Sequence, residues 1–316
     1  MTAEPQVSVV LAAYNAEPFL GAALDSIAEQ TFIGAMEVVV VDDGSTDATA
    51  EIVRRHRVGA RLIQQANAGS AAARNRGIEE ARGRYVAFHD ADDLWLPAKL
   101  DRQLAALAET GARWAYTDAW FFDADSGETL GRWSDTHPMP AGDVARDLLR
   151  GNFLTVPTVL VERAVLERVG GFPETLPGRA SISEDWALWL RIAAEHPIAR
   201  VEEPAARIRR HRGRKTTTMD LGLALEARVR LIEDAVARAP ERLGDLRGPA
   251  LAGVHLGIAR KHMERGEAGA ARALLLRAIR LAPGHLPTYP YLAASLAPAS
   301  GRRVLGRVRS AFRSLT

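Results

Sequence analysis

Apolar runs and amphipathic segments alternate through the first hundred residues of the chain. Continuous β-prone runs predict buried strands at 7–11, 36–41, 61–65 and 85–88, because a parallel strand covered on both faces needs no polar alternation. The spacing of apolar positions predicts a helix at Glu17–Gln30. A second helix is expected between the second run and about Arg55, and a third is expected to begin at Asn67–Ser70. This order predicts right-handed strand–helix–strand units and a mostly parallel sheet flanked by helices.

The next hundred residues are less regular. Residues 111–140 mix strand-like and loop chemistry, with a hairpin turn expected at Asp125–Glu128. A strand is expected at Asn152–Val161, a short helix at Glu162–Val169 and a glycine-terminated loop at Gly170–Glu174. A nearly all-apolar helix is expected after Ser183, its predicted N-cap, with two acidic residues in the first turn.

The pattern changes after Asp220, where Ala, Leu and Arg dominate and strand-like runs end. Helices are expected at Leu221–Ala239, Leu251–Arg265 and Ala268–Leu281. The spacing of small residues across the last two resembles a single tetratricopeptide-type hairpin. One such repeat cannot bury its own apolar face, so it is expected to dock on the rest of the chain, on a protein partner or on a second copy.

Residues 301–316 form a distinctive tail. They contain five arginines and no acidic residue, and their apolar residues recur at helical spacing. This pattern predicts a basic amphipathic helix, for which two interpretations stay open: a membrane-surface contact and a capping helix. The predicted organisation is an α/β domain at 1–219 with halves at 1–110 and 111–219, a helical extension at 220–300 and the tail.

Composition and charge narrow the class of protein. A chain of 316 residues has room for one large α/β domain and a smaller appendage, and 47% hydrophobic with 25% charged residues is ordinary for a globular protein. A net charge of +2 gives no reason to expect a nucleic acid partner. The absence of cysteine excludes disulfides and thiolate metal sites. Without a secretory signal or a long apolar stretch, the expected location is cytoplasmic, or at the inner face of the cytoplasmic membrane.

An acidic cluster, His89–Asp93, follows directly after the fourth apolar run. Its carboxylates, Asp90, Asp92 and Asp93, are therefore expected at the C-terminal edge of the sheet, where open α/β sheets bind ligands. Carboxylates this close repel one another unless a cation neutralises them, and Mg²⁺ or Mn²⁺ commonly bridges such oxygens to substrate phosphates. An ordinary Asp-rich turn before a helix is the alternative interpretation.

Earlier strand ends carry polar loops at the same edge. Tyr14 can stack on a nucleotide base, and Asp43 can accept a hydrogen bond from a base imide or a ribose hydroxyl. Arg74 and Arg76 lie in the first turns of a predicted helix, where the helix dipole disfavours cations, so a contact to a phosphate or a base is the favoured reason for them. Neither a P-loop nor a dinucleotide-binding glycine motif is present.

Four segments together resemble the successive motifs of the family 2 glycosyltransferases, which have the GT-A fold. The motifs are an apolar strand ending in Tyr-Asn, then Val-Asp-Asp-Gly-Ser-x-Asp, Asn-x-Gly-x-x-x-Ala-Arg-Asn-x-Gly and Asp-x-Asp-Asp. They occur here at Val7–Asn15, Val38–Asp47, Asn67–Gly77 and Tyr85–Pro97. Each motif is weakly specific alone, whereas four in this order and spacing are strongly specific. This chain departs from the family in carrying Ala12–Ala13 where a pair such as Pro-Thr is common, and His89 where an aliphatic residue is usual.

The resemblance implies a Rossmann-like nucleotide-diphospho-sugar transferase fold, here with a C-terminal all-helical extension. It implies that the nucleotide is held, with help from Arg74, by Ala12, Ala13, Tyr14, Asn15 and Asp43. It also implies that Asp90 and Asp92 bind the donor diphosphate and a metal ion, Mn²⁺ or Mg²⁺. Because residues 12 and 13 are alanines, any base contact there would use the backbone.

Two further segments acquire roles through the resemblance. In the family, a Glu-Asp pair before an aromatic residue carries the catalytic base on its Asp, which is Asp185 here, with Glu184 as the substitute candidate. The alternative is that both acids only stabilise the start of a helix. The basic run Arg209–Thr216 resembles a loop that closes over the donor diphosphate, and His211 is its candidate metal or phosphate ligand. A solvated charged face is the alternative for this run.

We therefore expect an inverting, metal-dependent glycosyltransferase of the hexosyl- or N-acetylhexosaminyl-transferase class. Its donor would be a nucleotide-diphospho-sugar, by preference a UDP-sugar, and its acceptor a hydroxyl of a glycan or a lipid-linked sugar in cell-surface polysaccharide, lipopolysaccharide or glycoconjugate assembly. A sugar nucleotidyltransferase is one alternative, although Ala12–Ala16 is not the glycine-rich basic loop that it would need. A sugar-nucleotide-binding scaffold protein derived from a transferase is the other.

Overall fold

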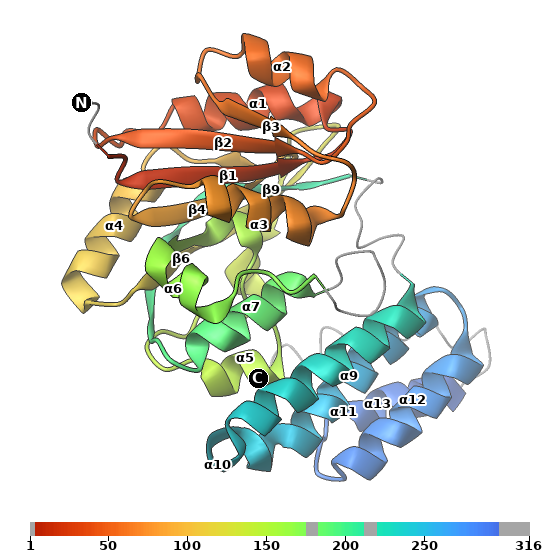
Figure 1. The fold of residues 1–316 in the computed structure, drawn as a ribbon. Helices are drawn as coiled ribbons and strands as arrows, with labels where there is room; N and C mark the ends of the chain where they lie inside the picture. The colour runs from red at the N-terminus through yellow and green to blue at the C-terminus, as the bar shows by residue number, and fades with distance from the viewer. Residues whose placement is uncertain (1–3, 175–182, 212–219, 297–316) are drawn as a thin grey trace. The chain divides into compact units, whose positions relative to one another are not determined.

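The computed structural model describes residues 4–174, 183–211 and 220–296. They form two compact units: the first comprises 4–148, 152–174 and 183–211, and the second comprises 149–151 and 220–296. Figure 1 shows a sheet with flanking helices in the first unit and a group of helices in the second. The predicted tail helix at 301–316, residues 212–216 of the basic run and the two residues before Ser183 lie outside the described residues. The predicted limits of the domains stay predictions.

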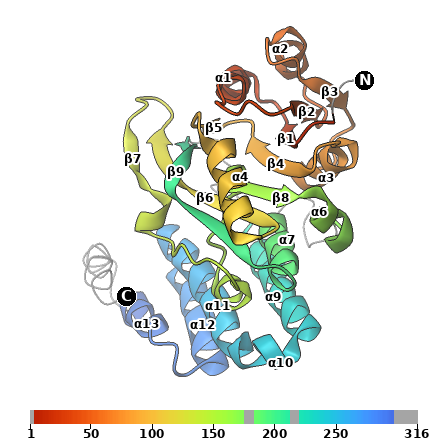
Figure 2. The same ribbon diagram turned by 90° about the vertical axis from the view of Figure 1, so that its left-hand side faces the viewer.

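One mixed sheet of nine strands runs through the described part of the first unit. The strand order is β3-β2-β1-β4-β8-β6-β9-β5, and β7 pairs with β6 at the side of this path (Figures 1 and 2). The strands are β1 (Val7–Ala13), β2 (Met36–Asp42), β3 (Arg61–Gln64), β4 (Tyr85–Asp90), β5 (Leu94–Trp95), β6 (Trp114–Asp123), β7 (Thr129–Arg132), β8 (Val159–Glu162) and β9 (Ile198–Arg210).

The two halves of the sheet differ in strand direction. Strands β3, β2, β1 and β4 are all parallel, which confirms the four strands and the parallel arrangement predicted for the first hundred residues. In the second half, β8 is antiparallel to both β4 and β6, whereas β9 is parallel to β6 and antiparallel to β5. The sheet is therefore an α/β sheet as predicted, but it is mostly parallel only in its N-terminal half.

Two elements differ from the sequence interpretation. The segment predicted as a strand at Asn152–Val161 is extended only in β8, because a 3₁₀ turn at Val156–Thr158, which contains Pro157, comes before it. Leu94–Trp95, interpreted as the lead-in to a helix, forms strand β5 and pairs with β9. The predicted hairpin turn at Asp125–Glu128 is confirmed, since it joins β6 to β7.

Helices cover both faces of the parallel strands. The described helices of the first unit are α1 (Glu17–Ala28), α2 (Thr49–Arg55), α3 (Ser70–Glu80), α4 (Lys99–Thr110), α5 (Ala145–Arg150, whose last two residues lie in the second unit), α6 (Arg163–Val169) and α7 (Glu184–Ala193). Alternate residues of β2 face opposite sides: Val38 and Val40 share a cluster with α1, whereas Val39 and Val41 pack with Ala73 of α3. Helix α3 is thereby held against the face of the sheet opposite to α1.

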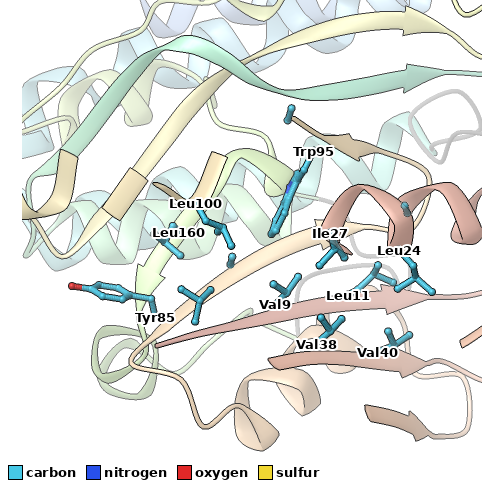
Figure 3. Packing of buried hydrophobic residues seen from close by; sticks show 14 of the residues in the cluster. Val9, Leu11, Leu24, Ile27, Val38, Val40, Tyr85, Trp95, Leu100 and Leu160 are labelled. Atoms are coloured by element: carbon cyan, nitrogen blue, oxygen red, sulfur yellow. The ribbon is translucent and has the colours of Figure 1, made fainter. Parts of the chain in front are cut away.

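The main core lies between α1, α4 and the sheet (Figure 3). Figure 3 shows Leu24 and Ile27 of α1 beside Leu11, Val38 and Val40 of the parallel strands. Each fully buried side chain of this size contributes about 1.5–3 kcal/mol through its removal from water. This packing holds the strands, and hence their C-terminal ends, at fixed spacing.

The second unit contains helices only among its described residues. They are α9 (Leu221–Arg238), α10 (Pro240–Leu243), α11 (Arg247–Glu264), α12 (Ala268–Leu281) and α13 (Thr288–Leu296). A small core of Leu256, Ala259, Ala271 and Leu275 joins α11 to α12, so the predicted helical hairpin is present. Its assignment as a tetratricopeptide-type repeat stays a prediction. Among the described residues of the whole chain, no helix has both the length and the apolar character that crossing a bilayer requires.

Candidate active site

The C-terminal ends of β1, β2 and β4 lie side by side, as predicted. The register places Ala12 of β1 opposite Val41 of β2 and opposite Asp90 of β4, and it pairs Ala13 with Asp42. The polar loops that follow these three strands therefore share one edge of the sheet, where ligands bind in open α/β folds.

Asn15 joins the loop after β1 to the loop after β2. Its N–H donates to Ser45 Oγ at 2.9 Å, and its Oδ1 accepts from the N–H of Thr46 at 2.9 Å. Its backbone is left-handed, with φ of 46°, a conformation that costs a non-glycine residue on the order of 1–3 kcal/mol. The side chain of Asn15 therefore orders the two loops. The neighbouring Tyr14 is 50% exposed, which leaves its ring free to stack on a base.

Asp43 is buried, and its carboxylate organises the loop that precedes α3. Oδ1 accepts from Gln65 Nε2 at 2.8 Å and from the N–H of Ala68 at 2.9 Å, while Oδ2 accepts from the N–H of Gly69 at 2.8 Å. A carboxylate has about four acceptor positions, so one remains. The contact to a base or ribose that the sequence predicts for Asp43 would have to use that position.

Arg74 of α3 links the acidic cluster to the second acidic motif. One terminal nitrogen donates to Asp90 Oδ1 at 2.8 Å and the other to Glu184 Oε1 at 2.9 Å, and the side chain is buried. Although burial acts to lower it, the pKa of the Arg74 guanidinium is raised by Asp90 and Glu184. Arg74 Nε is buried and makes no hydrogen bond to the described residues. The guanidinium thus bridges two carboxylates, a contact that the sequence did not predict for this residue.

Asp92 and His211, which the sequence predicts to act together, do meet. His211 Nε2 lies 3.0 Å from Asp92 Oδ2, and both side chains are partly buried. Arg209 holds the end of β9 against this loop, because its N–H donates to Asp93 Oδ1 at 2.8 Å and its Nε to the carbonyl of Asp92 at 2.7 Å. The ring of Phe19 lies 4.9 Å from that of His211. The beginning of the basic run is thus fixed beside the acidic cluster.

Two of the three predicted metal ligands lie together: His211 Nε2 is 3.0 Å from Asp92 Oδ2, whereas one oxygen of Asp90 accepts from Arg74. The described residues contain no group of three or more His, Asp or Glu side chains arranged to hold a metal ion. A carboxylate oxygen with an imidazole nitrogen fits a divalent ion that takes its remaining ligands from phosphates and water. A complete three-ligand site is not preformed among the described residues.

The two acids at the start of α7 have different surroundings. Glu184 is buried and accepts from Arg74 and, at 3.1 Å, from Ser70 Oγ. Burial and the charge of Glu184 raise the pKa of the Asp185 carboxyl to about 6, while the N–H of Trp186, Arg74 and Asn152 oppose the rise. Asp185 is thus the acid of the two that carries no direct ion pair in the described structure, and its pKa is close to neutral, as a general base requires.

Ser183 occupies the N-cap position of α7, but it does not cap in the predicted way. Its backbone is left-handed, with φ of 65° and ψ of 24°, and its hydroxyl makes no capping hydrogen bond. The reason is geometric, since an N-cap side chain reaches the helix from a β-region backbone. Ser183 and Asn15 are the two non-glycine residues with positive φ in the described ranges, and both lie at this candidate site.

Two buried polar residues, His89 and Lys99, lie within and shortly after the acidic cluster in the chain. His89 is fully buried, its Nδ1 lies 2.7 Å from the carbonyl of Asp90, and burial lowers its pKa to about 4. Lys99 is also fully buried, donates to Gln103 Oε1 at 2.7 Å and stacks over Trp95 at 4.0 Å. Burial lowers the pKa of Lys99 well below its ordinary value. His89, an unusual residue in the resembled motif, therefore stabilises the turn at Asp90 through its contact with the Asp90 carbonyl.

Sequence reasoning missed two residues of this region. Asn152 donates to Asp185, and the buried Lys99 lies over the ring of Trp95, which follows the acidic cluster. Lys99 reads as an ordinary surface charge in the sequence. Arg209 was part of the predicted basic run, but its bond to the carbonyl of Asp92 was not predicted. Nothing in the sequence around Asn152 indicated a contact with Asp185, because Asn152 lies in a segment that was interpreted as a regular strand. Arg76, which was considered with Arg74, pairs with Glu80 at 2.7 Å on its own helix.

Comparisons with known proteins agree with this arrangement. A family model described as glycosyl transferase family 2 matches residues 8–168. A Bacillus subtilis protein provisionally assigned as the teichuronic acid biosynthesis glycosyltransferase TuaG is 32% identical over 164 residues, which are 51% of this chain and 63% of that protein. The Escherichia coli UDP-Glc:alpha-D-GlcNAc-diphosphoundecaprenol beta-1,3-glucosyltransferase WfaP is 30% identical over 197 residues, 61% of this chain and 72% of that protein. The chain spans less than two thirds of the length of TuaG and of several further relatives, such as 38% of Escherichia coli YibD.

Two solved structures have a similar fold. TarS of S. aureus, residues 1–349 in complex with UDP-GlcNAc, has a TM-score of 0.66 and 20% identity, over 92% of this chain and 89% of that chain. The mannosyltransferase PcManGT from Pyrobaculum calidifontis, in complex with GDP-Man and Mn²⁺, has a TM-score of 0.59 and 24% identity, over 96% of this chain and 83% of that chain. At these identities the likeness concerns the fold.

Proposed function

The chain belongs to glycosyl transferase family 2 and has a GT-A-like fold, and from this premise we propose that it is an inverting transferase that uses a UDP-sugar. The proposed reaction moves the sugar to a hydroxyl of a glycan or a lipid-linked acceptor. The relatives named above support a role in building cell-surface polysaccharide, since two of them are named for such glycosylation.

The observation that carries the proposal is the bridge formed by Arg74. Donor chemistry needs cationic groups near a diphosphate, and acceptor chemistry needs a base near the anomeric carbon. Arg74 joins Asp90, from the strand edge that is expected to hold the donor, to Glu184, the direct neighbour of Asp185. Residues 110 apart in the chain are thus brought together at one place, as a single transfer site requires.

We assign the donor side to the edge formed by β1, β2 and β4. Tyr14 offers an exposed ring for the base, and Asp43 retains one acceptor position for the base or ribose. The UDP-Glc in the name of WfaP and the UDP-GlcNAc in the TarS complex support a uridine nucleotide, whereas PcManGT, in complex with GDP-Man, shows that the fold also accepts guanosine. Ala12 and Ala13 would approach the nucleotide through their backbone only.

Asp92 and His211 would hold a divalent cation, Mn²⁺ or Mg²⁺, together with the donor diphosphate. When bound, such an ion supplies positive charge that stabilises the departing diphosphate. Within the chain itself, the guanidinium of Arg74 adds positive charge beside Asp90. The Mn²⁺ in the PcManGT complex supports an ion of this kind in the fold.

Asp185 would remove the proton from the acceptor hydroxyl as that oxygen attacks the anomeric carbon. Its raised pKa of about 6 suits this role, because the group is mostly ionised at pH 7 and still basic enough to take a proton. Glu184 is held by Arg74 and Ser70, which leaves it a supporting role. One base without a second carboxylate placed as a nucleophile favours inversion of the anomeric configuration.

The test is nucleotide release from a panel of UDP-, GDP- and dTDP-sugars, each with Mn²⁺, with Mg²⁺ and with EDTA. We expect slow hydrolysis of a UDP-sugar that EDTA and Asp92→Asn abolish, with Asp234→Asn, an exposed acid of the second unit, as the matched control. Release from no donor, together with no metal-dependent UDP binding by calorimetry, would refute the transferase proposal and favour a scaffold protein. Release of pyrophosphate from a nucleoside triphosphate and a sugar phosphate would favour a nucleotidyltransferase.

A further inference from the structure

Asn152 has no role in the family motifs, yet its side chain contacts the candidate base. Its Nδ2 donates to Asp185 Oδ2 at 3.1 Å, and its Oδ1 accepts from the N–H of Leu154 at 3.1 Å. The second bond fixes the orientation of the amide, because only the oxygen can accept from a backbone N–H. The nitrogen must therefore point toward Asp185.

The two acids at the start of α7 have hydrogen-bond partners of different charge. Glu184 faces the buried cation Arg74, whereas both oxygens of Asp185 face neutral donors: Oδ2 faces Asn152, and Oδ1 accepts from the N–H of Trp186 at 2.7 Å. The charged groups that act on Asp185 are Glu184 on its own helix and Arg74 from α3. A neutral donor fixes a carboxylate in place without removing its basicity as a direct ion pair does.

We infer that Asn152 is the positioning residue that orients Asp185 and makes it, rather than Glu184, the base of the reaction. The inference rests on the proposed function and extends it to a residue outside every motif. The amide holds one carboxylate oxygen, so the carboxylate plane is fixed while lone pairs on both oxygens stay available for the acceptor hydroxyl. Without this bond Asp185 can rotate, and the position of its free lone pairs is lost.

The decisive variant is Asn152→Asp, which has the same shape. It keeps an oxygen for the N–H of Leu154, so the local turn is retained, and it places a carboxylate where Asp185 had a donor. Two carboxylates in contact repel, so the pKa of Asp185 is expected to rise further. The acid limb of the pH–rate profile for donor hydrolysis, with water as the acceptor, is expected to move up by about one pH unit.

A thermal double-mutant cycle tests the contact without any substrate. Asn152→Asp is expected to lower the unfolding midpoint at pH 8 by about 2–4 °C. The exchanged pair Asn152→Asp with Asp185→Asn restores a donor and an acceptor in reversed positions, so it is expected to recover the midpoint. It is not expected to recover hydrolysis, because the carboxylate then lies on the wrong element.

The matched control is Asn75→Asp. Asn75 is also an amide that donates to and accepts from the backbone of Phe172, and it has no hydrogen bond to Asp185 among the described residues. Its Nδ2 also donates to Glu174 Oε1 at 2.7 Å, so that Asn75→Asp likewise places two carboxylates together. Asn75→Asp is expected to change the unfolding midpoint equally in the wild-type and the Asp185→Asn background. The acid limb of its pH–rate profile is expected not to move. If Asn152→Asp does not fold, Asn152→Ser, which is too short to reach Asp185, takes its place. Its midpoint loss is expected to depend on the presence of Asp185, and its acid limb is expected to move up because the donor to the carboxylate is lost.

Two results would overturn the inference. Equal midpoint losses from Asn152→Asp with and without Asp185 would show that the two side chains do not interact. An unchanged acid limb, in a variant that is folded and hydrolyses the donor, would show that Asn152 does not govern the base. Failure of all donors in the wild-type protein is a different outcome, since it removes the proposed function and with it the role assigned to Asn152.

Discussion

Replacing Asp185 by Asn is expected to stabilise the folded protein at neutral pH while abolishing transfer. Burial and Glu184 raise the pKa of the Asp185 carboxyl from 3.8 to about 6. Each unit of this difference corresponds to about 1.4 kcal/mol, so keeping the carboxyl ionised in the folded protein costs about 3 kcal/mol above pH 6. The amide introduced by Asp185→Asn carries no charge and so removes this cost. It has only one accepting oxygen, however, so one hydrogen bond is lost and the protein is destabilised by about 1 kcal/mol. The expected net gain is about 1–3 kcal/mol.

The pH dependence follows from the direction of the shift. The folded protein binds the proton of Asp185 more tightly than the unfolded chain does, so the wild-type protein loses stability as the pH rises from about 4 to about 6. Asp185→Asn lacks this loss. Denaturant unfolding of both proteins from pH 4 to pH 8 is the assay, and the gain in free energy of unfolding is expected to be small at pH 4 and full at pH 7.

Glu184→Gln is the matched control. It removes the buried partner of Arg74, and breaking a buried ion pair costs about 3–5 kcal/mol, so this variant is expected to be less stable throughout the same pH range. Donor hydrolysis in Asp185→Asn is expected to fall by about 10²–10⁴-fold. The reasoning would be refuted if Asp185→Asn were no more stable than wild type at pH 8, or if its gain were the same at pH 4.

Substitutions at three further positions test other parts of the site. Asp43→Asn loses an acceptor for the loop before α3, so we expect a loss of about 1–3 kcal/mol in stability and at least tenfold weaker UDP binding by calorimetry. Lys99 carries a pKa lowered by burial, so wild-type stability is expected to rise from pH 7 toward pH 10, a rise that denaturant unfolding should not detect in Lys99→Met. Ser183→Val is expected to cost about 1–2 kcal/mol because a β-branched residue opposes left-handed backbone, whereas Ser183→Gly is expected to be tolerated, as thermal unfolding of both can show.

The N-terminal half of the fold was predictable because its strands are buried on both faces. Such strands read as continuous apolar runs, and β1, β2 and β4 occur where the runs predicted them. The polar residues at their ends could be placed together from the parallel topology alone, which is how Asp43 and Asp90 were identified. Asp92 and His211 were each named as candidate metal ligands through the family resemblance, but their direct contact was not predicted.

The second half was harder to predict because its elements depend on distant partners. Strand β5 has two residues and exists through its pairing with β9, more than 100 positions away in the chain. The 3₁₀ turn before β8 contains a proline within an apolar run that otherwise reads as a strand. Ser183 fits the sequence pattern of an N-cap, yet its backbone lies in the left-handed region, which the pattern does not indicate. The contact of Asn152 with Asp185 is of the same kind, since no local pattern specifies it.

Because Arg74 pairs with both Asp90 and Glu184, the proposed donor side and the proposed base are expected to be thermodynamically linked. A ligand that draws Asp90 away from Arg74 leaves the full charge of the guanidinium to Glu184, and this changes the field at Asp185. Linkage is reciprocal, so whatever alters the ionisation of Asp185 must alter the affinity for that ligand by the same factor. Donor affinity measured across the titration of Asp185 is therefore expected to vary with pH even where no donor group titrates. Under the proposed function, filling the donor side would change the basicity of Asp185, and a change in the ionisation of Asp185 would change donor affinity by the same factor.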